Sequence, residues 1–445
     1  MALSFHITLV CSIFFFFMIY PSIAKTSSNN KPKALVLPVT KDSSTKQYLT
    51  QLSQRTPLVP IKLTVDLGAP FLWANCDVGY VSSTYKPARC GSAQCSLADT
   101  NDCRDCFEFP PGPGCFNNTC RLYPENTING QTLITGVVSH DTLSLQSTNG
   151  FNPSKFVTVP KSIFVCSESR LGTLDDLASG VTGMAGLGRT KISLPSQFAS
   201  AFRFPKKFAI CLSSSTTSNG VMFFGDGPYV LLPGLDVSKN LIFTPLIRNP
   251  VSTASSPQKE EPSSEYFIRV KSVKINGKTV PLNKTLLTID SAGFGGTKIS
   301  TVKPYTELEA SIYNKFISVF EKQVGNHVPK VAPVAPFGLC YKSKSFDSTR
   351  VGAAVPPIDL VLQKKSVFWR IFGANSMVQV SNEVVCVGFV KAREDFPPKT
   401  PIIIGAHQLE DNLLQFDLDH SRLGFSSTLL SRQTTCANFN FTSNA

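Results

Sequence analysis

Short runs of alternating apolar and polar residues recur along much of the chain. Residues 61–65 (Ile-Lys-Leu-Thr-Val) and 272–275 (Ser-Val-Lys-Ile) alternate strictly, and residues 267–270 hold a similar run. Alternation with a period of two is typical of a strand that buries one face. Asn276-Gly277 follows directly and predicts a tight hairpin turn before residues 279–280. The short strand is therefore the element that we expect most often.

Helical periodicity is confined to two segments. Residues 194–201 form one, and residues 303–324 form another that begins near Pro304. The second segment has apolar side chains at roughly helical spacing, at Leu308, Ile312, Phe316, Val319 and Phe320. Residues 249–264 are polar and rich in Pro and Ser, which is typical of a loop or linker. The pattern predicts a mainly β protein with two lobes, whose boundary falls between residues 235 and 265.

The first 24 residues predict a secretory signal peptide. They contain no charged side chain, residues 7–20 form a short apolar run, and small residues precede Lys25. No later stretch approaches the roughly 20 apolar residues that a membrane-spanning helix requires. We therefore expect a protein secreted to the extracellular space (the apoplast), with no membrane anchor. The expected lobes are residues 25–240 and 241–445.

Composition and charge exclude some classes of protein. Hydrophobic residues make up 42% of the 445 and charged residues only 16%, which is incompatible with a disordered chain. The net charge is +13, yet the sequence has no run of five or more Lys or Arg and no nucleic-acid-binding motif. We expect no nucleic-acid partner. The charge favours acidic proteins or acidic polymers as partners.

Cysteine usage agrees with secretion. Of the 13 cysteines, Cys11 lies in the expected signal peptide, and the remaining twelve are enough for six disulfides in an oxidising compartment. The spacings of Cys103 with Cys106, and of Cys115 with Cys120, are also compatible with zinc, but the signal peptide favours disulfides. We therefore predict no metal and no cofactor. Three sequons predict glycosylation, at Asn117, Asn283 and Asn440.

Each half of the chain carries a similar pair of motifs. In the first half, Asp66 follows an apolar run and precedes Leu67-Gly68-Ala69, and a Gly-rich apolar run occupies residues 183–188. In the second half, Asp290 follows Ile289 and precedes Ser291-Ala292-Gly293, and an apolar run ending in Gly occupies residues 402–405. An ordered repeat of this kind indicates two copies of one structural unit.

The paired motifs resemble those of pepsin-like aspartic peptidases. Trp73 and the closing run 415–425 also fit that family, and residues 82–87, 295–301 and 405–412 are similar to a plant subgroup. The subgroup includes basic 7S globulins, extracellular dermal glycoproteins, and inhibitors of microbial xyloglucan endoglucanases and xylanases. The resemblance implies two β lobes with a cleft between them, and Asp66 and Asp290 as the catalytic positions.

The resemblance also implies a disulfide pattern, which spacing alone leaves open. The expected pairs are Cys76–Cys166, Cys90–Cys95, Cys103–Cys120, Cys106–Cys115, Cys211–Cys436 and Cys340–Cys386.

The supports of the peptidase site are incomplete in this sequence. Aspartic peptidases need two carboxylates that share one proton. Asp66 and Asp290 would supply both, although many relatives in the inhibitor subgroup lack the second. Three of the family's four supporting hydroxyls are missing, at Leu67, Ala69 and Gly293, and Ala292 replaces a Gly. The expected flap, residues 128–136, has no Tyr. We therefore predict weak or absent proteolysis.

The resemblance implies an inhibitor of glycoside hydrolases that microbes secrete, family 12 xyloglucanases above all. Relatives of this kind tend to carry Arg at two places, which are Arg350 and Lys399 in this chain. A cation that enters the cleft of such an enzyme would meet its two catalytic carboxylates. His407 adjoins Gly405 and is expected to be structural. Two alternatives are an active aspartic endopeptidase that uses Asp66 and Asp290, and a storage or peptide-binding basic globulin.

Overall fold

The computed structural model describes residues 31–76, 79–106, 112–132, 136–167, 172–253, 262–395 and 398–442. Residues 32–445 form one unit. Strands dominate this unit, so the mainly β prediction is confirmed. Within the described ranges, no helix is both long and apolar enough to cross a membrane.

Most strands are short, as the alternating pattern predicts. Those of the first half are β1 (Ala34–Lys41), β2 (Tyr48–Gln54), β3 (Val59–Asp66), β4 (Trp73–Asn75), β5 (Lys86–Pro87), β6 (Cys103–Arg104), β7 (Thr119–Leu122), β8 (Glu125–Asn126), β9 (Gln131–Thr132), β10 (Gly136–Thr148), β11 (Pro153–Ser167), β12 (Gly183–Gly186), β13 (Lys207–Cys211), β14 (Gly220–Gly225), β15 (Val230–Leu232) and β16 (Leu235–Asp236).

The second half continues in the same way. Its strands are β17 (Ile242–Ile247), β18 (Tyr266–Ile268), β19 (Ser272–Ile275), β20 (Lys278–Thr279), β21 (Thr297–Ile299), β22 (Thr306–Leu308), β23 (Lys330–Val331), β24 (Cys340–Lys342), β25 (Ser348–Thr349), β26 (Gly352–Ala353), β27 (Ile358–Val361), β28 (Phe368–Ile371), β29 (Met377–Gln379), β30 (Val384–Val387), β31 (Phe389–Lys391), β32 (Ile402–Ile404), β33 (Leu413–Asp417) and β34 (Arg422–Phe425). The predicted hairpin at Asn276-Gly277 joins β19 to β20.

Helices are few and mostly short. The α-helices are α1 (Ala93–Leu97), α2 (Leu194–Phe202), α3 (Ala310–Val324), α4 (Gly373–Ser376) and α5 (Ala406–Leu409), and the 3-10 helices are η1 (Val237–Asn240), η2 (Lys284–Leu287), η3 (Ser343–Ser345), η4 (Leu430–Arg432) and η5 (Cys436–Asn438). The second predicted helix begins later than Pro304 because residues 306–308 form β22, which pairs with β31 and β32. Glu309 then caps α3 by accepting hydrogen bonds from the backbone N–H groups of Ser311 and Ile312.

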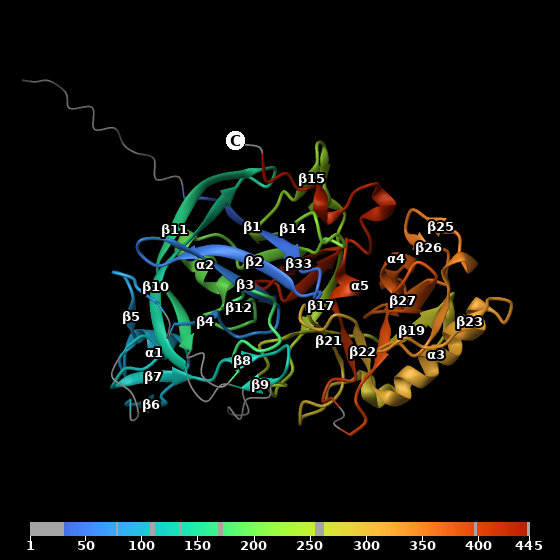
Figure 1. Cartoon of the computed structure of the whole chain (residues 1–445), viewed down its shortest axis with the longest axis horizontal. Helices are drawn as coiled ribbons and strands as arrows, with labels where there is room; N and C mark the ends of the chain where they lie inside the picture. Colours follow the sequence, from blue (N-terminus) through green and yellow to red (C-terminus); the bar gives the residue numbers. More distant parts are fainter. Residues whose placement is uncertain are drawn as a thin grey trace, which may run out of the picture. The chain divides into compact units, whose positions relative to one another are not determined.

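Two groups of strands repeat one arrangement; the strands of the first are coloured blue to green in Figure 1, and those of the second yellow to red. In the first, β3 pairs antiparallel with β2 and parallel with β12, which also pairs antiparallel with β4, and β4 runs parallel to β11. In the second, β21 pairs antiparallel with β18 and parallel with β32, which also pairs antiparallel with β22, and β22 runs parallel to β31. The order and direction of pairing are the same, so the chain contains two copies of one structural unit.

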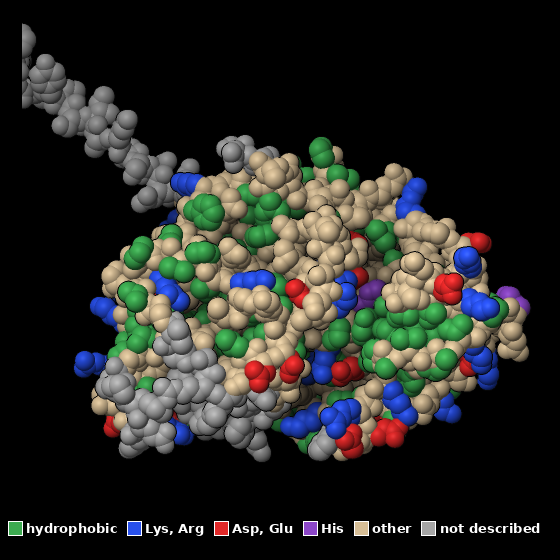
Figure 2. Space-filling view, in the orientation of Figure 1, with side chains coloured by type: hydrophobic (Ala, Val, Ile, Leu, Met, Phe, Trp, Pro, Cys, Tyr) green, Lys and Arg blue, Asp and Glu red, His purple; other side chains and the backbone are tan. Residues whose placement is uncertain are grey.

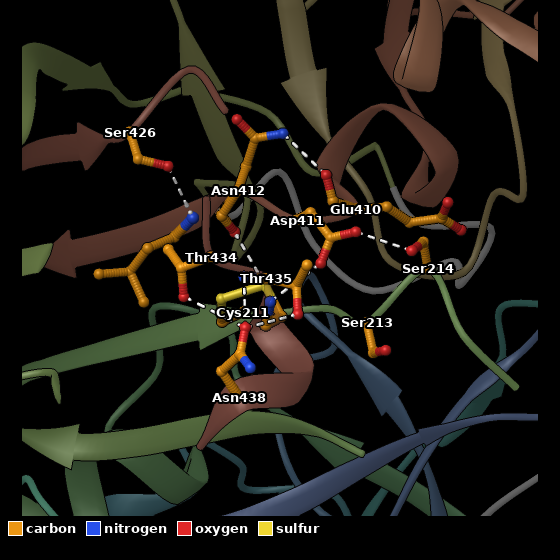
Figure 3. The surroundings of a disulfide bond; sticks show 12 residues. Cys211, Ser213, Ser214, Glu410, Asp411, Asn412, Ser426, Thr434, Thr435 and Asn438 are labelled. Atoms are coloured by element: carbon orange, nitrogen blue, oxygen red, sulfur yellow. Dashed lines mark hydrogen bonds between the residues drawn. A yellow bond between two sulfur atoms is a disulfide. The ribbon is translucent and has the colours of Figure 1, made fainter. Parts of the chain in front are cut away.

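Strands from the two halves of the chain also pair with each other. Strand β13 pairs antiparallel with β33, and the disulfide Cys211–Cys436 ties the end of β13 to η5. Figure 3 shows how Asp411 holds this region, because its carboxylate accepts hydrogen bonds from the backbone N–H of Cys436 (2.9 Å) and the hydroxyl of Ser214 (2.7 Å). The C-terminal tail is therefore anchored to the first half of the chain by a covalent bond and by hydrogen bonds.

The twelve cysteines that follow Cys11 all form disulfides. Four of the expected pairs are present: Cys76–Cys166, Cys106–Cys115, Cys211–Cys436 and Cys340–Cys386.

The expected pairs Cys90–Cys95 and Cys103–Cys120 are wrong, because the bonds are Cys90–Cys103 and Cys95–Cys120. Helix α1 buries Cys95 beside the equally buried Cys120, so these two sulfurs meet in the interior. Cys103 is exposed, although β6 sets its Cα opposite that of Cys120, and it bonds to Cys90 instead. Burial of the side chains therefore decided the pairing, which the short loop between Cys90 and Cys95 could not reveal.

Candidate functional site

Asp66 ends strand β3, opposite Gly186 of the parallel strand β12. Its side chain is buried. A Cβ atom at Gly186 would lie 2.1 Å from the carbonyl oxygen of Phe71, so only glycine permits the chain after Asp66 to pass this closely. The predicted motifs around Asp66 and residues 183–188 thus meet in space.

Both oxygens of the Asp66 carboxylate accept hydrogen bonds from the protein itself. Oδ1 accepts from the backbone N–H groups of Gly68 (2.8 Å) and Ala69 (3.1 Å), and Oδ2 accepts from the hydroxyl of Thr127 (2.6 Å). Burial raises the pKa of Asp66 above its ordinary value, although these three hydrogen bonds act in the opposite direction, and the charge of Glu265 adds to the rise.

Thr127 belongs to the turn between β8 and β9, directly before the segment where we expected the flap. Trp73 supports this hairpin, because its indole N–H donates to the carbonyl oxygen of Glu125 (3.1 Å). Residues 133–135 of the predicted flap lie outside the described residues. The hairpin therefore brings the hydroxyl of Thr127 to the carboxylate of Asp66.

Ser300 occupies in the second structural unit the position that Asp66 has in the first. Strand β21 ends at Ile299, opposite Ile404, so Ser300 follows at the level of Gly405 just as Asp66 lies at the level of Gly186. A Cβ atom at Gly405 would lie 2.3 Å from the carbonyl oxygen of Tyr305, five residues after Ser300. Phe71, the corresponding contact of Gly186, is five residues after Asp66.

The local hydrogen bonds confirm this equivalence. The hydroxyl oxygen of Ser300 accepts from the backbone N–H groups of Val302 (3.3 Å) and Lys303 (3.2 Å), which are two and three residues further on. The Oδ1 atom of Asp66 accepts from the residues at the same two offsets. A serine hydroxyl cannot act as the second carboxylate of an aspartic peptidase.

Asp290, our expected second catalytic residue, lies elsewhere. It is exposed, in a turn between η2 and β21, and its Oδ1 accepts hydrogen bonds from the backbone N–H groups of Ala292 and Phe294 (both 2.9 Å). No hydrogen bond among the described residues joins it to Asp66. The prediction of an Asp66–Asp290 pair is therefore wrong, because residues 289–293 imitate the motif while the strand register aligns Ser300.

Thr301 joins the two structural units beside Asp66. Its hydroxyl donates to the carbonyl oxygen of Val65 (2.7 Å) and accepts from the backbone N–H of Leu67 (3.0 Å). The equivalent residue of the first unit is Leu67, whose side chain lies in the hydrophobic core and has no hydroxyl to return the contact. The Ser-Thr pair directly after β21 is the signal in the sequence that could have identified this position in place of Asp290.

A partly buried ion pair lies next to the loop that follows Asp66. Lys298 of β21 contacts Glu265 at 2.6 Å, and a Cβ atom at Gly68 would lie 2.9 Å from Cγ of Glu265. Burial by itself would raise the pKa of Glu265, but the charge and hydrogen bond of Lys298, with hydrogen bonds from Thr253 and Ser263, lower it below its ordinary value. Glu265 is therefore a partner of Lys298 and no substitute for the missing carboxylate.

The two residues predicted to contact a target enzyme are both exposed. Arg350 lies in the turn between β25 and β26. Lys399 lies in the loop before β32, where its ammonium is 6.0 Å from the ring of exposed Phe294 and 3.5 Å from the carbonyl oxygen of Ser252. The structure gives no contact between Arg350 and Lys399 within its described ranges.

The other predicted positions either lie on the surface or have a structural role. Asn117, Asn283 and Asn440 are exposed. His407 bonds to Glu410 and to the carbonyl oxygen of Met377, in agreement with a structural role. Among the side chains that the structure describes, no group of three or more His, Cys, Asp or Glu is arranged to hold a metal ion.

Comparisons with protein families and with known proteins find relatives along most of the chain. Residues 48–226 match the family described as "Xylanase inhibitor N-terminal", and residues 265–427 match "Xylanase inhibitor C-terminal". The chain is 59% identical to "Probable aspartic proteinase GIP2" of Nicotiana benthamiana, with 98% of each protein covered. It is 45% identical to "Gamma conglutin 1" of Prunus dulcis, over 92% of this chain and 90% of the relative.

Solved structures extend the likeness to the fold. The crystal structure of edgp aligns with a TM-score of 0.90 and 56% identity, over 93% of this chain and 99% of that one. An aspartic proteinase from Irpex lacteus aligns with a TM-score of 0.57 at 16% identity, over 90% of this chain and 99% of that one, and shows the pepsin-like fold alone. The chain belongs to the xylanase-inhibitor family, which is built on the pepsin-like aspartic proteinase fold.

Proposed function

We propose that this protein is a secreted plant defence protein that binds and inhibits microbial cell-wall-degrading endoglucanases, family 12 xyloglucanases first among them. The observation that carries the proposal is Ser300 at the position equivalent to Asp66, with the hydroxyl of Thr127 on the remaining carboxylate. One carboxylate cannot form the proton-sharing pair of an aspartic peptidase. Membership of the xylanase-inhibitor family supports a glycoside hydrolase as the partner.

Arg350 is the residue that we propose enters the cleft of the target. Glycoside hydrolases use two carboxylates that flank the scissile bond. A planar guanidinium can bind a carboxylate through two parallel hydrogen bonds. Arg350 stands exposed at the tip of a hairpin, which supports this role. Lys399 keeps the positive charge but lacks the fork, and we assign it a smaller contribution.

Several features support secretion and a cell-wall setting. The first 24 residues have the pattern of a signal peptide, six disulfides suit an oxidising compartment, and the three sequons are exposed. The net charge of +13 supports weak association with acidic cell-wall polymers. Figure 2 shows Lys and Arg spread over the visible face with Asp and Glu among them, which favours diffuse attraction over one basic site there.

Inhibition of a purified family 12 xyloglucanase tests the proposal. Arg350→Ala should weaken inhibition about 30-fold or more, because truncating a charge pair at a buried interface costs about 2–5 kcal/mol. Arg269→Ala is the matched control, since Arg269 is also an exposed arginine of the second half. Absence of inhibition by the wild type would refute the function. An unchanged inhibition constant in Arg350→Ala would refute only the role of this residue.

A further inference from the structure

The outer face of the first half of the chain has a hollow of about 370 Å³ where three strands separate. Strand β1 pairs with β10 as far as Val36, and from Val39 onward it pairs with β2 instead. Strand β10 in turn pairs with β2 at Ser144 (Figure 1). The three ladders therefore leave a gap between them. Leucines that belong to the hydrophobic core line the bottom of the gap, at Leu37, Leu52 and Leu145.

Four polar side chains surround this gap, and strand register places them on one face. Ser53 lies opposite Ser144, Gln51 lies opposite Lys62, and Gln146 lies opposite Phe156. Gln51 is exposed and Ser53 and Gln146 are partly exposed, and none of the three makes a side-chain hydrogen bond with any described residue, so their polar groups are available to a ligand. Ser144 is only 1% exposed and forms part of the wall of the hollow.

The remaining lining residues indicate the chemistry of that ligand. Phe156 is 66% exposed at the edge of the hollow, beside Gln146. The electron-rich face of an aromatic ring attracts the partly positive C–H groups of a sugar ring. Amide and hydroxyl groups supply both donors and acceptors for sugar hydroxyls. No Asp or Glu lines the hollow, and its one cation, Lys62, donates to the carbonyl oxygen of Ser179 (2.9 Å).

We propose that this hollow binds a neutral oligosaccharide, with one sugar ring against Phe156 and the next over the polar side chains. The volume lies in the range of small-molecule sites. An extended peptide fits less well, because peptides of that kind add along a free sheet edge, and the gap leaves only Gln51 and Leu52 of β2 and Leu145 of β10 without a paired strand on that side. The site is independent of the proposed inhibitory contact at Arg350.

Calorimetric titration of the full mature protein with cellotetraose tests this site. We expect saturable binding that weakens at least tenfold in Phe156→Ala and also in Gln146→Leu. Phe151→Ala is the matched control, because Phe151 is 49% exposed in the turn between β10 and β11 and does not line the hollow. This variant should bind as the wild type does.

Three results would overturn the proposal: no saturable binding of cellotetraose, equal binding by Phe156→Ala and wild type, or equal binding of tetragalacturonate, which would show that the site does not select neutral sugars. Inhibition of the xyloglucanase should be the same in Phe156→Ala and wild type. The outcome for the sugar site is therefore separable from the outcome for the inhibitory function.

Discussion

Replacing Thr301 by Val removes the hydroxyl that joins the two structural units and keeps the shape of the side chain. In the wild type this hydroxyl bonds the carbonyl oxygen of Val65 and the N–H of Leu67, and all three residues are buried. A buried polar group that loses its partner costs about 1–3 kcal/mol. With two such groups, we expect the free energy of unfolding to fall by about 2–6 kcal/mol.

The assay is thermal unfolding followed by calorimetry and circular dichroism. One kcal/mol shifts the melting temperature of a chain this long by about 1–2 °C, when the usual value is scaled with length. Thr301→Val should therefore melt about 2–12 °C below the wild type. Thr301→Ser keeps both hydrogen bonds, loses one methyl group and should cost about 1 kcal/mol. Equal melting temperatures for the two variants would refute the reasoning.

Three further predictions concern buried carboxylates. Burial raises the pKa of Asp66, so the contribution of this residue to stability is fully present below the unfolded pKa and is lost as pH rises through the folded pKa. Asp66→Asn should therefore melt higher relative to wild type at pH 7 than at pH 3. A difference in melting temperature that does not change with pH would contradict this. Ser300→Asp should destabilise the protein at pH 7 by charge repulsion, and less so in an Asp66→Asn background; an equal cost in both backgrounds would show that the two positions are not neighbours. The pKa of Glu410 is lowered, because the hydrogen bonds and charges of His407 and Lys41 outweigh the opposing effect of burial. The stabilisation by Glu410 is therefore present above the unfolded pKa and is lost as pH falls through the folded pKa. In thermal melting, Glu410→Gln should be destabilising at pH 7 and nearly neutral at pH 3.

The sequence by itself determined the class of fold and the absence of supporting hydroxyls in the loop that follows Asp66. Alternating runs predicted strands such as β3 and β19, because successive side chains of a strand point to opposite faces, and apolar residues at every second position therefore indicate one buried face. The even number of cysteines after Cys11 predicted six disulfides. Leu67 and Ala69 showed directly that hydroxyls were missing beside Asp66, since the absence of a chemical group needs no coordinates.

Only the tertiary structure decided which residues correspond to each other and which meet across the molecule. The pairing of β21 with β32 identified Ser300 as the equivalent of Asp66, and the burial of the Cys95 side chain brought it beside Cys120. Thr127 reaches Asp66 from a hairpin 61 residues away in sequence. Such contacts depend on strand register and packing, which many residues set jointly. A local motif such as that around Asp290 can therefore imitate a catalytic loop and still lie in an exposed turn.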